Sequence, residues 1–350
     1  MSMEIEQTTA AILVQQNQPL VIDEVSLPEH LAVGQVLVEV FFSGICGSQL
    51  GEIAGVKGPD PYLPHLLGHE GSGQVLATGP GVDSVIVGDH VVLHWRPGSG
   101  IQSVPPRFIW RDQSLNAGFV TTFNKHTVVS ENRLTSIPKD YPMEFAALFG
   151  CAVTTGIGVV ENKAALRMGE SVVVVGSGGV GLNVIQGAKL RSALPIVAVD
   201  LFDNRVKLAL DVGASHGLVN KGASWVTQVR DIVGEDGADV VVDNTGKPEV
   251  IGQCIELTKP SGKTILIGVP PKGERTSVNT LPLHFGKVLT GTHGGDGEPS
   301  HDIPRLLHLS HANILDLSKL ITATYPLSEI NEAIEDMRSG KISGRCLVAM

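Results

Sequence analysis

The sequence lacks an excess of basic residues and any long apolar run. Its 26 lysines and arginines face 36 acidic residues, a formal net charge of -10, whereas a nucleic-acid-binding surface calls for a basic stripe. No apolar run approaches the ~18 residues of a membrane span. The first ten residues, MSMEIEQTTA, show neither the basic nor the apolar segment of a signal peptide. We therefore expect a cytoplasmic protein that binds neither nucleic acid nor membrane.

Cysteine is also scarce. The four cysteines, at positions 46, 151, 254 and 346, are too few and too scattered for a disulfide framework, which fits a reducing compartment. We expect Cys254 and Cys346 to be buried packing residues. The length of 350 residues suggests two domains.

The most informative stretch is SVVVVGSGGVG, which ends at Gly181. An apolar strand, 171–175, runs into a glycine-rich turn and then a helical stretch, the arrangement that binds a dinucleotide. Gly176 makes the turn, Gly178 lets the backbone approach a pyrophosphate, and Gly181 packs helix against strand; the helix N-terminus faces the phosphates. The residues expected to bind cofactor here are Gly176, Gly178, Gly179, Val180 and Gly181.

Asp200 ends the next expected strand, 196–199. Its carboxylate can accept hydrogen bonds from both hydroxyls of an adenosine ribose and would repel a 2′-phosphate. The sequence therefore predicts NAD(H) rather than NADP(H) as cofactor.

Strand-like and helical runs alternate after residue 150. Six strands with mostly helical crossovers predict an α/β Rossmann domain with a doubly wound, parallel, six-stranded sheet. The first 150 residues show short strands between turns and predict a mainly β domain, to which the C-terminal helix and strand return. We assign 1–153 and 296–350 to the catalytic domain and 154–295 to the NAD-binding domain. The strands are expected at 171–176, 196–200, 217–220, 238–244, 263–269 and 287–292.

Three separated motifs of the β domain carry potential metal ligands: Cys46 in GICGS, His69 in GHEG and Cys151 in FGCAVTTG. Two thiolates and an imidazole form a plausible zinc site with a fourth position open to substrate. Taken singly, each motif is weak evidence: a lone buried cysteine is more often a core packing residue than a metal ligand, and His69 alone is ambiguous.

Together with GSGGVG, VGDHV and RSGKISGR, these motifs resemble the zinc-dependent alcohol dehydrogenases of the medium-chain dehydrogenase/reductase superfamily, over nearly the whole chain. The resemblance implies a GroES-like catalytic domain with one catalytic zinc on Cys46, His69 and Cys151. It further implies Glu70 as a transient ligand and Ser48 as the hydrogen-bond partner of the substrate oxygen. Further implied contacts are Arg345 with the pyrophosphate, Arg205 with the adenosine ribose, and Trp95 with the substrate.

The sequence departs from the family in three ways. Residues 94–113, HWRPGSGIQSVPPRFIWRDQ, contain no cysteine where many relatives bind a second, structural zinc, so we predict none. Gln49 stands where relatives have an aspartate that orients the zinc-bound histidine, and Gly51 replaces a histidine of the proton relay. A neutral amide supports the imidazole less strongly than a carboxylate does.

The sequence thus predicts an NAD(H)-dependent alcohol dehydrogenase that transfers hydride reversibly between a small alcohol or its carbonyl and nicotinamide, with zinc stabilising the bound alkoxide or polarising the carbonyl. Three alternatives stay open: a polyol or sugar dehydrogenase, a zinc-free quinone or enone reductase, and a non-catalytic NAD-binding protein. By resemblance, a homodimer or homotetramer is expected. The substrate and the physiological direction do not follow from the sequence.

Overall fold

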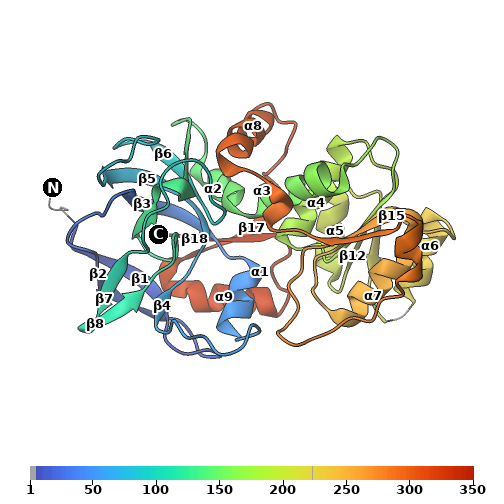
Figure 1. Cartoon of the computed structure of the whole chain (residues 1–350), viewed down its shortest axis with the longest axis horizontal. Coiled ribbons are helices and arrows are strands. Elements are labelled where there is room, and N and C mark those ends of the chain that lie inside the picture. Colours follow the sequence, from blue (N-terminus) through green and yellow to red (C-terminus); the bar gives the residue numbers. More distant parts are fainter. Residues whose placement is uncertain (1–4, 223) are drawn as a thin grey trace. The chain divides into compact units, whose positions relative to one another are not determined.

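The computed structural model describes residues 5–222 and 224–350, which divide into two compact units. Unit 1 comprises Met1–Cys151, Glu298–Asn313 and Ile321–Met350, and unit 2 comprises Ala152–Gly297 and Ile314–Leu320. Each unit is described by itself. Figure 1 labels their helices and strands.

Unit 2 contains a six-stranded sheet in which every pairing is parallel. Its elements are α3 (Ala152–Gly158), η3 (Val159–Ala164), β11 (Val172–Val175), α4 (Gly179–Leu190), β12 (Ile196–Asp200), α5 (Asp203–Val212), β13 (His216–Val219), α6 (Trp225–Val233), β14 (Ala238–Asp243), α7 (Pro248–Leu257), β15 (Thr258–Leu266), η4 (Leu281–Phe285), β16 (Val288–Gly291) and η5 (Gly294–Asp296). The strand order is β13-β12-β11-β14-β15-β16. The predicted doubly wound Rossmann sheet is therefore confirmed.

Burial explains why unit 2 folds this way. All four valines of β11 are buried, as expected for a central strand of a parallel sheet that is covered on both faces. Helices α4 to α7 supply the crossovers, and Cys254 on α7 is fully buried in the core. The proline-rich segment between β15 and β16 contains only the short helix η4, in agreement with the irregularity of its sequence.

Unit 1 is mainly β in its N-terminal part. Its elements there are β1 (Gln7–Leu13), β2 (Val21–Ser26), β3 (Gln35–Gly44), α1 (Gly47–Ile53), β4 (His65–Leu66), β5 (Glu70–Thr78), β6 (His90–His94), β7 (Arg107–Trp110), β8 (Gln113–Asn116), β9 (His126–Ser130), η1 (Glu131–Arg133), β10 (Leu134–Ile137), α2 (Met143–Ala146) and η2 (Ala147–Gly150). Strands β1, β2, β7, β8 and β4 close a barrel, and β10, β6, β5 and β3 continue one sheet with β9 paired to β3.

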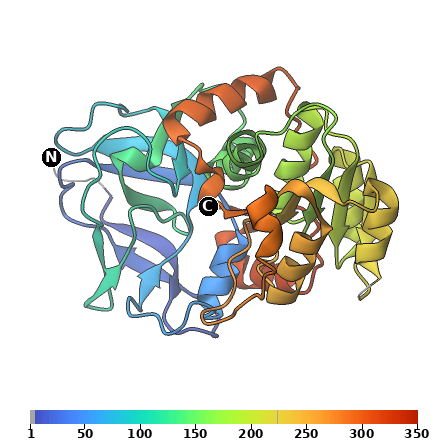
Figure 2. The same cartoon turned by 45° about the vertical axis from the view of Figure 1, so that its right-hand side comes forward.

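The C-terminal segments complete unit 1. They form α8 (Pro299–His311), β17 (Ile321–Pro326), η6 (Leu327–Glu329), α9 (Ile330–Arg338) and β18 (Arg345–Ala349), coloured orange to red in Figure 2. Strand β18 pairs antiparallel with β3 and parallel with β17, so the chain returns to the first sheet as the sequence predicts. Cys346 on β18 is buried in the core beneath α9.

One segment differs from the sequence-based division of the chain. Residues Ile314–Leu320 belong to unit 2, although we assigned all of 296–350 to the catalytic domain. Leu315, Leu317 and Leu320 are buried, and the Lys319 ammonium donates a hydrogen bond to the Asp211 carbonyl of α5 at 3.2 Å. Short apolar spacing of this kind gives no helix or strand signal, which is why the sequence did not reveal it.

No single described helix has the length and apolar character needed to cross a membrane. One pair of helical segments, Met143–Gly150 and Ala152–Ala164, passes that test only when taken together, and it is bent by 53°.

Candidate metal centre and dinucleotide-binding turn

Three segments of unit 1 bring Cys46, His69 and Cys151 together, each from a junction between elements. Cys46 lies between β3 and α1 and is the N-cap of α1. His69 directly precedes β5, and Cys151 follows η2. Junctions leave side chains free to turn away from the ladder of backbone hydrogen bonds, so they suit a ligand set.

The geometry of this cluster fits a metal. One ligand atom from each residue lies within 4.8 Å of the other two. Cys151 is buried and the other two are half-buried. All four cysteines are free thiols, and the buried His69 Nε2 has no hydrogen-bond partner among the residues that the structure describes. A buried nitrogen without a partner calls for an explanation, and sulfur with imidazole nitrogen is the donor set zinc prefers.

Electrostatics favour a thiolate at Cys46. The Cys151 thiol, by hydrogen bonding, and the His69 imidazole hold the pKa of the Cys46 thiol well below its ordinary value, despite the opposing effect of burial. The thiolate is the form of cysteine that binds a metal. The cluster is therefore preorganised for metal binding on electrostatic grounds as well as by position.

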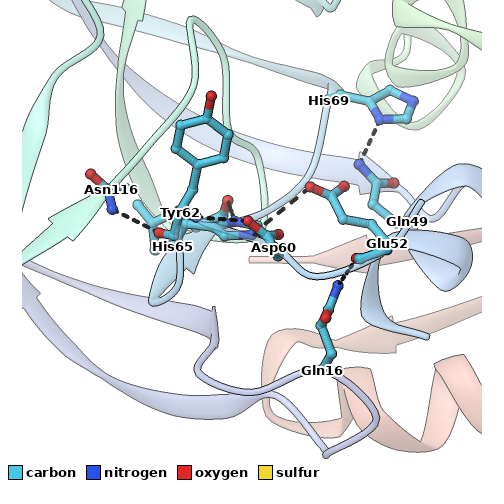
Figure 3. A network of polar contacts seen from close by, with 10 residues as sticks. Gln16, Gln49, Glu52, Asp60, Tyr62, His65, His69 and Asn116 are labelled. Atoms are coloured by element: carbon cyan, nitrogen blue, oxygen red, sulfur yellow. Dashed lines mark hydrogen bonds and ion pairs between the residues drawn. The ribbon is translucent and has the colours of Figure 1, made fainter. Parts of the chain in front are cut away.

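Gln49 on α1 contacts two residues of the cluster. Its side-chain nitrogen lies 2.6 Å from His69 Nδ1 (Figure 3), and its Oε1 accepts a hydrogen bond from the Cys46 backbone N–H at 3.3 Å. The residue is only 2 % exposed. One amide thus contacts two of the three candidate ligands.

Glu70 and Arg345 form a buried ion pair beside the cluster. Glu70 is fully buried and Arg345 is 3 % exposed. A Cβ on Gly44 would lie 2.5 Å from the Glu70 carboxylate and 2.6 Å from the Arg345 guanidinium, so only glycine leaves room for the pair. We expected Glu70 beside the metal and Arg345 at the cofactor pyrophosphate; the structure shows the two paired with each other, and both expected roles stay predictions.

Two further expected residues lie near the ligands. Ser48 lies in the first turn of α1, and its side chain is exposed. Trp95 follows β6 and meets the His69 ring edge-on, with ring centroids 6.4 Å apart. An indole at this distance forms an apolar wall beside His69.

The glycine-rich turn of unit 2 shows what each glycine does. Gly176 has φ 95°, in the region that favours glycine. A Cβ on Gly181 would collide with the Gly176 carbonyl, whereas one on Gly178 would meet nothing within 4 Å. The fold therefore requires the first and last glycines, and Gly178, the N-cap of α4, leaves open space at the start of a helix. Gly179 and Val180 follow as its first residues.

Asp200 lies at the end of β12, where the ribose partner is expected. One of its carboxylate oxygens accepts a hydrogen bond from the Ser177 N–H at 2.7 Å, and the other from the Phe202 N–H at 3.1 Å. The Arg205 guanidinium lies 4.0 Å from it and stacks over the Phe202 ring. Two backbone bonds fix the orientation of the carboxylate while leaving it further lone pairs to accept with.

A second group of potential ligands, Glu52, Asp60 and His65, was not anticipated as a cluster (Figure 3). His65 is already committed on both nitrogens: Nδ1 lies 2.9 Å from the Leu66 carbonyl and Nε2 lies 2.9 Å from Asp60. The cluster fastens the segment between α1 and β4, and no motif in the sequence signals it.

The chain matches two protein families over most of its length. Residues 32–139 match the alcohol dehydrogenase GroES-like domain and residues 179–312 the zinc-binding dehydrogenase family. An S-(hydroxymethyl)glutathione dehydrogenase of Paracoccus denitrificans is 32% identical over 369 residues, covering 95% of this chain and 97% of the relative. A class-3 alcohol dehydrogenase of Cereibacter sphaeroides is 33% identical with the same coverage.

Solved structures give the same result. The benzyl alcohol dehydrogenase of Acinetobacter calcoaceticus superposes with a TM-score of 0.88 at 28% identity, covering 99% of this chain and 100% of that one. An alcohol dehydrogenase zinc-binding domain protein of Burkholderia ambifaria also has a TM-score of 0.88 at 28% identity, with coverage of 98% and 99%. The chain therefore belongs to the zinc-dependent alcohol dehydrogenase family of the medium-chain dehydrogenase/reductase superfamily.

Proposed function

We propose that this protein is an NAD(H)-dependent alcohol dehydrogenase with one catalytic zinc ion per chain, acting reversibly on a small alcohol or its carbonyl. The observation that carries the proposal is the convergence of Cys46, His69 and Cys151 within 4.8 Å, with the buried His69 Nε2 unpartnered in the described chain. The two named relatives, an S-(hydroxymethyl)glutathione dehydrogenase and a class-3 alcohol dehydrogenase, support the reaction class.

In this chemistry the protein would hold the metal and orient the substrate. Zinc bound to two thiolates and an imidazole would act as a Lewis acid on the substrate oxygen. Ser48, exposed two residues beyond Cys46, is placed to exchange a proton with that oxygen. Gly51 offers no side chain to continue a relay, so the ribose of a bound cofactor with water, or another group, would have to carry the proton onwards. Trp95 supplies an apolar wall beside His69.

We propose that unit 2 binds NAD(H) rather than NADP(H). The open space at Gly178 and the start of α4 suit a pyrophosphate, because helix N-termini present unpaired N–H groups and a positive dipole end. The oriented Asp200 carboxylate suits the ribose hydroxyls and disfavours a 2′-phosphate, and Arg205 flanks it. The roles expected from the family, Arg345 for the pyrophosphate and Glu70 as a transient metal ligand, would each compete with the ion pair that the two residues form with each other.

We also propose that there is no structural zinc and that the chain forms a homodimer or homotetramer. Residues 96–118 contain no cysteine. In unit 2 the edge strand β16 and the preceding η4 expose apolar side chains, among them Phe285 at 76% and Leu281 at 62%. Exposed apolar side chains beside a sheet edge suit association.

The experiment that tests the proposal is metal content per chain by elemental mass spectrometry, on protein purified without chelators, with turnover measured on NAD and NADP. We expect about one zinc per chain and oxidation of alcohols with NAD. The substrate panel should include benzyl alcohol and S-(hydroxymethyl)glutathione, which name relatives. Two zinc ions per chain would contradict the single-site proposal, and a metal-free protein that still binds NADH would leave the reductase or non-catalytic alternative.

A further inference from the structure

The Gln49 amide stands between two of the zinc ligands, and its chemistry limits what it can offer them. In the structure its oxygen accepts a hydrogen bond from the Cys46 N–H. Its nitrogen faces His69 Nδ1 (Figure 3). A carboxamide oxygen accepts through two lone pairs and its NH₂ only donates; here the oxygen and the nitrogen face different neighbours. With the nitrogen as donor, His69 Nδ1 must carry a lone pair and the ring proton lies on Nε2.

Metal binding reverses the requirement at His69. A ligand nitrogen binds through its lone pair, so a metal at the unpartnered Nε2 places the ring proton on Nδ1. That Nδ1–H then needs an acceptor, while the Cys46 N–H remains a donor in either case. Two donors then lie at opposite atoms of the amide, and in this geometry its oxygen faces only one of them.

Neither orientation of the amide satisfies both donors. If the oxygen stays on Cys46, the Gln49 NH₂ faces the His69 N–H. If the amide turns over, its NH₂ faces the Cys46 N–H, and the N-cap of α1 loses its side-chain hydrogen bond. Gln49 is 2 % exposed, so water is a poor substitute, and a buried donor without a partner is costly.

We propose that Gln49 is a positioning residue that limits how tightly the Cys46–His69–Cys151 site holds zinc, because zinc binding leaves one buried donor without an acceptor. This inference rests on the proposed zinc site. We expect the amide to turn over on zinc binding, because it lies closer to His69 Nδ1, at 2.6 Å, than to the Cys46 N–H, at 3.3 Å. The Cys46 N–H then becomes the donor without an acceptor.

The test is Gln49→Glu in the full-length protein, with zinc affinity measured by competition with a chromogenic chelator. Glutamate has the shape of glutamine but two acceptor oxygens, one for each donor. We expect zinc to bind about 10- to 100-fold more tightly than in the wild type, the range typical for outer partners of a metal-bound histidine. Equal affinities within twofold would overturn the proposal.

The matched control is Gln35→Glu. Gln35 is 3 % exposed in the same unit, and its amide accepts from the Ala32 N–H and donates to the Val104 carbonyl. Glutamate there turns an acceptor towards a carbonyl, so we expect lower stability with unchanged zinc affinity. A change in zinc affinity as large as that of the Gln49 variant would show that a buried negative charge alone is responsible.

Hydrogen exchange at the Cys46 amide gives a second readout, available on the wild type even if the variant does not fold. In the wild type, zinc loading should increase the hydrogen-exchange rate of the Cys46 amide. In Gln49→Glu the amide should stay protected. If Gln49 acted only through electrostatics, zinc loading would leave this exchange rate unchanged. Slower or unchanged exchange in the loaded wild type would contradict the turn of the amide. Absence of zinc binding in every variant would refute the proposed site itself, and with it this role.

Discussion

The Cys46–His69–Cys151 cluster and the surroundings of Glu131 lie in the same unit, and both bury groups that need partners. Glu131 is fully buried. One of its oxygens accepts from the N–H of Asp83 and from the N–H and hydroxyl of Ser84, and the other accepts from the Ile101 N–H, all at 2.7–2.9 Å. In the ligand cluster, by contrast, His69 Nε2 has no partner among the described residues.

The side chains of η1 fix a segment that is irregular in sequence. Glu131 holds the start of the cysteine-free stretch, and Arg133 adds bonds to the Trp95 carbonyl at 2.7 Å and to Gln102 at 3.1 Å. The side chains of η1 thus tie down the region in which relatives were expected to use a structural metal. We call the ligand cluster the open region, because the buried His69 Nε2 has no partner among the described residues and calls for an explanation. We call the surroundings of Glu131 the closed region, because the protein supplies partners for both oxygens of this carboxylate.

The largest predicted effect comes from removing a ligand from the open cluster. Cys46→Ser should lose zinc and lower turnover by at least about 1,000-fold, since several kcal/mol of polarisation depend on the metal and each 1.36 kcal/mol is tenfold. NADH binding should persist. Elemental analysis, steady-state turnover and NADH titration measure the three quantities.

The matched control is Cys254→Ser, on the buried face of α7. It should keep zinc and turnover while losing some stability, because a hydroxyl replaces a packing thiol. If Cys46→Ser kept full activity, the cluster would not be the catalytic metal site.

Local sequence motifs made the dinucleotide-binding turn and the ligand cluster predictable. The valines of β11, the turn from Gly176 to Gly181, and Asp200 lie within one stretch of sequence, so their spacing alone indicates the unit. Cys46, His69 and Cys151 are far apart, and they were found together only because each lies in a motif of the resembled family. Their convergence within 4.8 Å is a property of the fold.

The contacts around Glu131 and the ion pair of Glu70 with Arg345 could not be predicted in the same way. Glu131 and Arg133 lie in a stretch with no recognisable motif, and the pairing of Glu70 with Arg345 joins a residue of β5 to one of β18. Such contacts depend on how distant strands come together, which neither periodicity nor spacing encodes. For the same reason, the sequence does not predict the pairing of His65 with Asp60.

The closed region is broken by Glu131→Gln, which turns an NH₂ towards one of the donor N–H groups. We expect the free energy of unfolding to fall by about 2 kcal/mol, the scale of a hydrogen bond to a charged group, with zinc content unchanged. Glu29→Gln, at an exposed position, should change stability by less than about 0.5 kcal/mol. Urea unfolding measures both changes in stability. A loss of zinc in Glu131→Gln would contradict the assignment of separate roles to the two regions.

The stability difference between the wild type and Glu131→Gln should also depend on pH. Burial raises the pKa of Glu131, but the hydrogen bonds from Ile101, Ser84 and Asp83 outweigh it and hold the pKa below its ordinary value of 4.5. A carboxylate whose folded pKa is lowered stabilises the fold above its unfolded pKa and loses that contribution as pH falls through the folded pKa. The difference should be constant at neutral pH and shrink below about pH 4.5; a gap that widened on acidification would contradict this.

The smallest predicted effect concerns Asp200, which is intermediate between the open and the closed region. Backbone N–H groups satisfy part of its carboxylate and leave the remaining lone pairs for a ligand. Asp200→Ser removes the charge that would repel a 2′-phosphate, so the ratio of kcat/KM for NAD to that for NADP should fall by about tenfold or more, equivalent to 1.4 kcal/mol. Asp203→Ser is the control, since Asp203 is exposed on α5 and pairs with Lys207. An unchanged ratio in Asp200→Ser would mean that this carboxylate serves the turn at Ser177 alone, and that it belongs with Glu131 among the closed sites.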